Sequence, residues 1–208
     1  MTNVLIIDSA ATGEASVTRR LTAELETVLR GRGPVSIVHR DVGTHPIPHL
    51  TAETTPVIRG AEPATDSGRD ALALSDSLVA ELKAADLVVI GAPMYNFGIA
   101  STLKAWFDHV LRAGITFRYS EAGPEGLLKG KKTIVIESRA GLYSSGPSAP
   151  MDSQEPHLRT LLAFMGLDDA RFVRVEKLAF GPEQAAASIA EAIDEIRALA
   201  TEELPLAA

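Results

Sequence analysis

The sequence predicts an α/β fold in which a doubly wound sheet of five parallel strands carries helices on both faces. Two observations support this prediction. Short runs rich in Val, Ile and Leu alternate along the chain with amphipathic segments, and loops of small or polar residues follow the runs. Because parallel neighbouring strands need helical crossovers of one hand, this alternation favours a parallel sheet. For such a sheet we expect the strand order 2-1-3-4-5.

The expected elements are evenly spaced. The strands are expected at residues 4–7, 35–38, 87–90, 133–136 and 171–175. Helices are expected at residues 16–30 and 67–84, after Phe97, near residues 157–165, and from the Gly181-Pro182-Glu183 segment onward. Between the second strand and the second helix, a long irregular stretch is expected from His45 to about Pro63. Loops of that length in compact domains are usually functional or mobile.

Composition limits the classes of function. With 208 residues, 46% of them hydrophobic, the chain can bury one substantial core, and we expect a single domain over residues 1–208. The net charge of -7 argues against nucleic acid as a partner, since phosphate binding needs clustered Lys and Arg. The sequence contains no cysteine, which excludes disulfides, thiolate metal sites, Fe–S clusters and a cysteine nucleophile. Redox chemistry would therefore need a bound cofactor.

Targeting and metal signals are weak. No apolar run approaches the ~20 residues of a membrane span, and the first strand follows the first three residues without a basic region. We therefore expect a cytoplasmic protein without a membrane partner. His45 and His49 lie near Asp41, but Pro46 and Pro48 prevent helical presentation, so a solvated loop is the better interpretation than a metal site.

Three loops carry the candidate site. They comprise residues 9–18, 93–98 and 138–141, each after a predicted strand, and in the order 2-1-3-4-5 they would converge on one crevice. The first offers several hydroxyls and a helix N-terminus, which can hold a phosphate. The second, Met-Tyr-Asn-Phe, can lie along a flat aromatic ring such as a flavin. Two plainer interpretations stay open: Ser16 simply caps its helix, and the apolar side chains of the second loop pack on the core.

Competing nucleotide and hydrolase motifs are absent. A dinucleotide site requires G-x-G-x-x-G after the first strand, where this chain has Ser-Ala-Ala-Thr-Gly at residues 9–13. Residues 126–133 look like a phosphate loop, but their glycines are too close together and a strand follows where a helix is needed. There is no G-x-S-x-G elbow, so a serine hydrolase has little support.

Several longer motifs in register resemble one enzyme family. They are Ala-Pro-Met-Tyr-Asn-Phe at 92–97, Asp108 followed by Arg-Ala-Gly-Ile-Thr-Phe-Arg-Tyr at 112–119, Gly-Pro-Glu-Gly-Leu at 123–127, and Ser-Arg-Ala-Gly at 138–141. Over nearly the whole chain, this set resembles the FMN-dependent NADH:quinone oxidoreductases and azoreductases. The resemblance implies a flavodoxin-like homodimer that binds FMN. In that family NADH reduces the flavin, and a quinone or azo compound reoxidises it by two-electron ping-pong transfer.

The resemblance also implies which residues contact the cofactor. Ser16, Val17 and Thr18 would hold the phosphate region, residues 94–97 would line the isoalloxazine, and residues 138–141 would contact its other edge. The full set of expected cofactor contacts is Ser9, Ala10, Ser16, Val17, Thr18, Pro93, Met94, Tyr95, Asn96, Phe97, Ser138, Arg139, Ala140 and Gly141. The family often has a second serine at Ala10 and glycine at Ala140. One phosphate or ribityl hydrogen bond is then either lost or supplied by Ser9.

Outside the three loops, substrate contacts are expected from few residues. Arg59 could contact the nicotinamide cofactor or an anionic acceptor, and a solvated arginine is an equal alternative. Tyr119 is a candidate for an aromatic acceptor pocket, whereas Phe164 reads better as core. We expect no catalytic acid or base, since the flavin carries the hydride, and Trp106 and Phe107 suggest an exposed dimer face.

Two other functional classes stay open. A flavodoxin-like electron carrier or flavin-binding regulatory protein without NADH turnover would share the aromatic loop. The excursion over residues 114–127 before the fourth strand favours the enzyme, because it could create an acceptor pocket. A cofactor-free α/β binding protein would purify without yellow absorbance and stay colourless after FMN addition.

Overall fold

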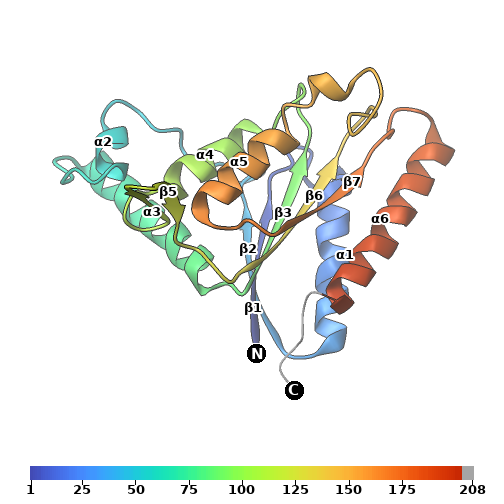
Figure 1. Ribbon diagram of the computed structural model, residues 1–208, viewed down its shortest axis with the longest axis horizontal. Helices are drawn as coiled ribbons and strands as arrows, with labels where there is room; N and C mark the ends of the chain where they lie inside the picture. The colour runs from blue at the N-terminus through green and yellow to red at the C-terminus, as the bar shows by residue number, and fades with distance from the viewer. Residues whose placement is uncertain (203–208) are drawn as a thin grey trace.

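The computed structural model describes residues 1–202 and has the expected sheet (Figure 1). Its five parallel strands are β1 (Thr2–Asp8), β2 (Val35–Asp41), β3 (Leu87–Pro93), β6 (Lys132–Ser138) and β7 (Ala170–Val175). They hydrogen-bond in the order β2-β1-β3-β6-β7. The separate pair β4 (Phe117–Ser120) and β5 (Gly123–Gly126) is antiparallel. The core order is therefore the expected 2-1-3-4-5, although each strand is longer than the apolar run that predicted it.

Helices cover both faces of the sheet, as Figure 1 shows. On one face lie α1 (Val17–Arg32) and α6 (Pro182–Glu202); on the other lie α3 (Asp66–Ala84), α4 (Ser101–Val110) and α5 (Glu155–Met165). Successive side chains of β6 point to opposite faces of the sheet and so belong to two separate parts of the hydrophobic core. Ile134 and Ile136 pack with α1 and α6, whereas Val135 packs with the helices of the opposite face. The extent of the domain over residues 1–208 stays a prediction, since its last six residues lie outside the described ones.

The stretch expected to be irregular contains a helix. Within residues 45–63 the structure has α2 (Thr54–Ile58), so the expectation was wrong for those five residues. Thr51 and Thr54 explain the start of the helix, because each side-chain oxygen accepts a hydrogen bond from the other's backbone amide at 2.9 and 3.2 Å. Val57 and Ile58 are buried and anchor the turn to the protein.

The expected exposed face of α4 is also wrong. Trp106 and Phe107 are both fully buried and pack edge to face with ring centroids 5.0 Å apart. The reason is the position of α4 between α3 and α5 over the sheet (Figure 1). A helix with neighbours on both flanks buries a wider stripe than one at the edge of a layer.

The excursion before β6 is a docked hairpin. Strands β4 and β5 lie against the end of α5, where the amide of Leu128 donates to the carbonyl of Met165 at 2.9 Å. A Cβ placed on Gly126 would lie 2.0 Å from the backbone nitrogen of Gly166, so only glycine permits this approach. The ring of Phe117 packs on that of Phe164 at 4.5 Å, in keeping with the packing role expected for Phe164.

Candidate functional site

The three predicted loops lie together at the carboxyl ends of three neighbouring strands. Residues 9–18 follow β1, residues 93–98 end β3 and continue past it, and residues 138–141 do the same for β6; we call these three segments the loop cluster. Direct hydrogen bonds join them: the Ala11 amide donates to the Tyr95 hydroxyl at 3.0 Å, and the Met94 amide donates to the carbonyl of buried Ser138 at 2.9 Å. The expected convergence is therefore present in the fold.

The first loop presents the N-terminus of α1. Ser16 is the N-cap, because its hydroxyl accepts a hydrogen bond from the amide of Arg19 at 3.3 Å. The same hydroxyl lies 3.0 Å from that of buried Thr18. In the described chain, the amides of Val17 and Thr18 have no acceptor. Capping and anion binding are thus compatible here, since amide donors at the helix terminus stay available.

Ser9 and Ala10 are interior residues. The Ser9 hydroxyl donates to the carbonyl of Gly91 at 2.7 Å, and both Ser9 and Ala10 are fully buried. The Ser9 hydroxyl therefore joins β1 to β3 rather than facing the surface of the loop. The carbonyl of Ala10 lies so close to Gly43 that a Cβ there would be 2.2 Å from the oxygen. A contact of either residue with a cofactor stays a prediction.

The first cation of α1, Arg19, is already paired. Arg19 bonds the carboxylate of Asp41 at 2.6 Å, and that carboxylate also accepts the amides of Gly43 and Thr44, each at 3.0 Å. Burial acts to raise the pKa of Asp41, but the hydrogen bonds from Thr44 and Arg19 outweigh it and lower that pKa. An anion at the start of α1 would therefore meet amide and hydroxyl donors rather than an unpaired Arg19.

The second loop is a strained two-residue turn. The amide and carbonyl of Tyr95 bond those of Gly98 at 2.9 and 3.0 Å, leaving Asn96 and Phe97 as the turn residues. Both have left-handed backbones, with φ of 47° and 72°. Tight hairpins require this conformation, which costs a residue other than glycine on the order of 1–2 kcal/mol. The side chain of Phe97 is 40% exposed at this turn. Strain of this kind is typical of ligand-binding segments.

The residues flanking that turn are less exposed. Pro93 is buried at the end of β3, and Met94 and Tyr95 are half-buried. Tyr95 and Ile99 also pack against the core, so the plainer interpretation of this loop holds in part. The exposed groups of the second loop are those of Asn96 and Phe97.

The third loop places Arg139 in the interior, and any contact of this residue with a cofactor stays a prediction. The side chain of Arg139 is fully buried, and its amide donates to the carbonyl of Val175 at 2.8 Å, so neither group faces the loop surface. By contrast, the amides of Ala140 and Gly141 have no acceptor in the described chain. A Cβ on Gly141 would lie 3.0 Å from the ring of Tyr143. Backbone groups of residues 140–141, rather than a side chain, are what this loop offers.

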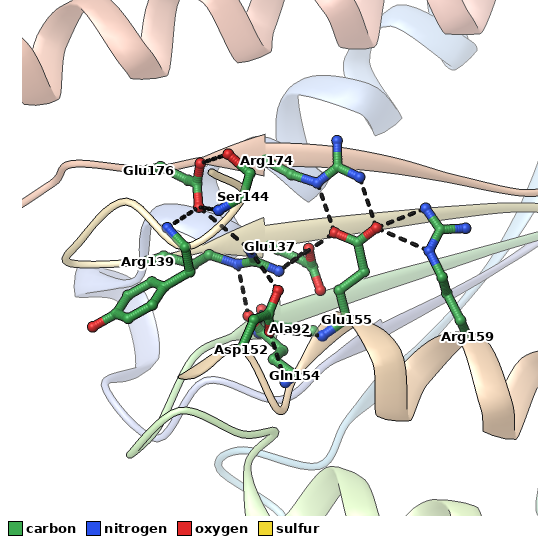
Figure 2. A network of polar contacts seen from close by, with 11 residues as sticks. Ala92, Glu137, Arg139, Ser144, Asp152, Gln154, Glu155, Arg159, Arg174 and Glu176 are labelled. Atoms are coloured by element: carbon green, nitrogen blue, oxygen red, sulfur yellow. Dashed lines mark hydrogen bonds and ion pairs between the residues drawn. The ribbon is translucent and has the colours of Figure 1, made fainter. Parts of the chain in front are cut away.

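A buried polar network behind the third loop was missed by the sequence prediction (Figure 2). It joins residues of β6 and the loop after it, of the segment before α5, of α5 itself, and of the end of β7 and the residue after it: Glu137, Arg139, Ser144, Asp152, Gln154, Glu155, Arg159, Arg174 and Glu176. One signal was present in the sequence. Glu137 directly follows the apolar run at residues 134–136 of β6, and a carboxylate in such a place needs a buried partner.

The two expected substrate contacts lie apart from the loop cluster. Arg59 is exposed and follows α2, and Tyr119, 73% exposed, packs edge to face on Phe117 at 5.5 Å in the hairpin. In the view of Figure 1, α2 and the hairpin lie on the left, separated from the loops that follow β3 and β6. Contacts of Arg59 and Tyr119 with a substrate stay predictions.

The described residues offer neither a metal cluster nor a membrane span. Within residues 1–202 no cluster of three or more His, Asp or Glu side chains could hold a metal ion. Among the same residues, no helix is long and apolar enough to span a bilayer. The expected cytoplasmic location stays a prediction.

Comparison with known proteins identifies the family. A family model described as "Flavodoxin-like fold" matches residues 2–200. An FMN-dependent NADH:quinone oxidoreductase of Hyphomonas neptunium is 51% identical over 201 residues, which cover 96% of each chain. The chain belongs to this family.

Other members and a solved structure agree with this assignment. An FMN-dependent NADH:quinone oxidoreductase of Ralstonia nicotianae is 46% identical over 192 residues, covering 89% of this chain and 91% of the relative. The crystal structure of an azoreductase from Bacillus anthracis superposes with a TM-score of 0.88 at 26% identity, covering 97% of this chain and 100% of the other. The resemblance inferred from the loop motifs is thus confirmed, and with it the expected class of enzyme.

Proposed function

We propose that this member of the FMN-dependent NADH:quinone oxidoreductase family binds FMN at the loop cluster and uses NADH to reduce quinones to hydroquinones. We extend the proposal to azo compounds, which would be cleaved to aromatic amines, and to a two-electron ping-pong sequence. The observation that carries it is the junction of three loops, in which amide donors with no acceptor among the described residues accompany a strained, partly exposed aromatic turn. Bound FMN would supply the chemistry, accepting a hydride equivalent and passing two electrons onward.

The first loop fits the phosphate. At the start of α1, the amides of Val17 and Thr18 have no acceptor within residues 1–202, and the Ser16 hydroxyl lies beside them. Helix termini of this kind bind phosphate because their amides point outward and the helix dipole favours negative charge. Arg19 is committed to Asp41, so we assign it a structural part rather than a direct contact.

The second and third loops fit the ring system. Asn96 and Phe97 form the exposed turn, and Asn96 can both donate and accept hydrogen bonds through its amide group. The amides of Ala140 and Gly141 are donors that would stabilise negative charge developing on the ring without a dedicated acid. We therefore assign the site no catalytic acid or base.

A homodimer stays part of the proposal and rests on the family alone. Trp106 and Phe107, the residues expected to form its face, are buried in the protein. Light scattering over a dilution series tests this point: a dimer that persists at the lowest concentration supports it, and a monomer throughout refutes it.

Anaerobic stopped-flow mixing tests the activity. FMN-loaded protein is mixed first with NADH and then with a benzoquinone or an azo dye while the flavin absorbance is followed. Bleaching followed by recovery in a separate phase supports the ping-pong oxidoreductase, and each acceptor is scored by its own recovery phase. Bound flavin that NADH does not bleach would favour the electron carrier, and failure to retain FMN would refute the flavoprotein assignment.

A further inference from the structure

Arg139 has an unusual environment for a residue of a cofactor-facing loop. Its side chain turns into the interior and is completely buried. The guanidinium lies 2.6 Å from Glu137, 3.1 Å from Asp152 and 3.2 Å from Glu176, and its Nε donates to the side-chain oxygen of Gln154 at 3.0 Å (Figure 2). One cation thus meets groups from three separate segments of the chain.

The first set of contacts leads to the second loop. The Gln154 side chain donates to the carbonyl of Ala92 at 2.7 Å, directly before Pro93. Next to it, the amide of Ser153 donates to the carbonyl of Phe97 at 3.0 Å. The segment that Arg139 holds is therefore bonded both to β3, just before the second loop, and to the strained turn itself.

The second set leads to the third loop. The carboxylate of Glu176 accepts the amides of Tyr143 and Ser144 at 2.8 and 2.9 Å. Burial acts to raise the pKa of Glu176, but these hydrogen bonds, with those from the Ser144 hydroxyl and Arg139, lower it and keep the carboxylate ionised. The ring of Tyr143 in turn contacts Gly141 and packs edge to face on Phe97 at 6.0 Å.

Arginine suits this position better than lysine would. Its planar group offers five donors in fixed directions, whereas an ammonium offers three on a flexible stem. A buried cation of this kind is weak evidence of added stability, since desolvation offsets much of the attraction between the charges. The geometry is better explained by what the contacts hold in place.

We propose that Arg139 is a positioning residue that fixes the second and third loops relative to each other, acting through Gln154 and Glu176. The proposal rests on the proposed function, because the purpose of the fixed geometry is a preformed FMN site. A preformed site binds more tightly because the ordering of its loops is completed before the ligand arrives.

One variant tests the contacts through Gln154 and a second tests those through Glu176. In both variants Arg139 keeps acidic side chains as partners. Gln154→Met removes the bond to Ala92, and Glu176→Gln removes the charge that holds Tyr143. FMN-loaded protein is diluted, and FMN release is followed by flavin fluorescence at a temperature where far-UV circular dichroism shows each variant fully folded. We expect each variant to raise the dissociation constant for FMN by on the order of tenfold. We also expect each to change the visible circular dichroism of the bound flavin.

Arg112 provides the matched control. It is also a buried arginine, paired with Asp76 and bonded to Ser75 at 3.2 Å, but it lies beyond the far end of α4. Ten helical residues span about 15 Å, so this ion pair is remote from the turn that precedes the helix. Arg112→Lys should lower the thermal midpoint and leave FMN release and the flavin dichroism unchanged.

The outcomes separate the two proposals. Wild-type protein that releases FMN at once refutes the proposed function. A different result refutes only the positioning role of Arg139: the wild type retains FMN, and both Gln154→Met and Glu176→Gln release FMN at the wild-type rate with wild-type flavin dichroism. If Gln154→Met is unfolded at the test temperature, it is replaced by Gln154→Glu, which keeps an acceptor for Arg139 and loses the donor to Ala92.

Discussion

The hydroxyl of Tyr95 accepts a hydrogen bond from the backbone amide of Ala11 at 3.0 Å, across 84 positions of sequence. This bond ties the loop after β1 to the loop after β3. The two loops would contact opposite parts of the cofactor, the phosphate and the ring. Their separation is therefore set partly by the length of one tyrosine side chain.

Removing that hydroxyl tests its importance. Tyr95→Phe leaves the amide of Ala11 without its partner, and a lost hydrogen bond of this type is worth about 1 kcal/mol. We expect FMN to bind severalfold more weakly in this variant, with little change in thermal midpoint. Equilibrium titration with FMN and a thermal melt of the same sample measure both quantities. An unchanged FMN affinity would show that the bond does not set the spacing of the loops.

Asn96 is expected to contribute to FMN binding through both its backbone conformation and its side-chain amide, and two variants can separate these contributions. Its φ of 47° is tolerated by asparagine but costs alanine on the order of 1 kcal/mol. Asn96→Ala should weaken FMN retention and turnover through both contributions. Asn96→Gly keeps the turn and removes only the amide group, so it should recover part of the loss. If both variants retain FMN as the wild type does and oxidise NADH at its rate, Asn96 lies outside the site.

The sheet order and the position of the loops could be predicted because both depend on local patterns. Apolar runs, helical spacing and parallel crossovers leave few arrangements, and the second loop follows β3 as expected. The direction of side chains is different. Ser9 and Arg139 are polar residues in loops, and the sequence around each does not indicate that its side chain is buried.

Contacts between distant segments account for what the sequence did not predict. Arg139 is buried because acidic residues up to 37 positions away pair with it. The periodicity of the sequence does not indicate which distant residues come together. Trp106 and Phe107 are buried for a similar reason, since neighbouring helices flank α4. The reciprocal hydrogen bonds of Thr51 and Thr54, by contrast, are a local feature of the sequence, because the two residues are only three positions apart.

Gly43 should be intolerant of substitution although it lies outside the predicted site. A Cβ there would lie 2.2 Å from the carbonyl oxygen of Ala10, so Gly43→Ala must displace the first loop. We expect a lower thermal midpoint and weaker FMN binding. Gly31→Ala is the matched control: this helical glycine has nothing within 4 Å of the added carbon, and alanine there should stabilise α1 by about 1 kcal/mol. Equal midpoints for the two variants would contradict the prediction.

Glu137 makes the stability of the protein depend on pH in an unusual direction. Burial raises its pKa from 4.5 to about 8, with only partial opposition from Arg139. One carboxyl oxygen bonds Arg139 at 2.6 Å, and in the described chain the other has no partner. The group is therefore mostly protonated at neutral pH in the folded protein and ionised in the unfolded chain.

The sign of the effect follows from proton linkage. Because the folded protein holds this proton more tightly, the stabilising contribution is complete below pH 4.5 and is lost as the pH rises towards about 8. The slope for one proton is at most about 1.4 kcal/mol per pH unit.

Glu137→Gln should flatten the decline in unfolding free energy between pH 5 and 8, measured by urea titration. Glu53→Gln, at an exposed position, should keep it. Glu155 does not interfere with this measurement. Burial acts to raise its pKa, but Arg174 and Arg159 outweigh burial and lower that pKa to about 2. The contribution of Glu155 to stability is therefore lost only below pH 4.5. Parallel curves for wild type and Glu137→Gln over this range would show that Glu137 is ionised in the folded protein.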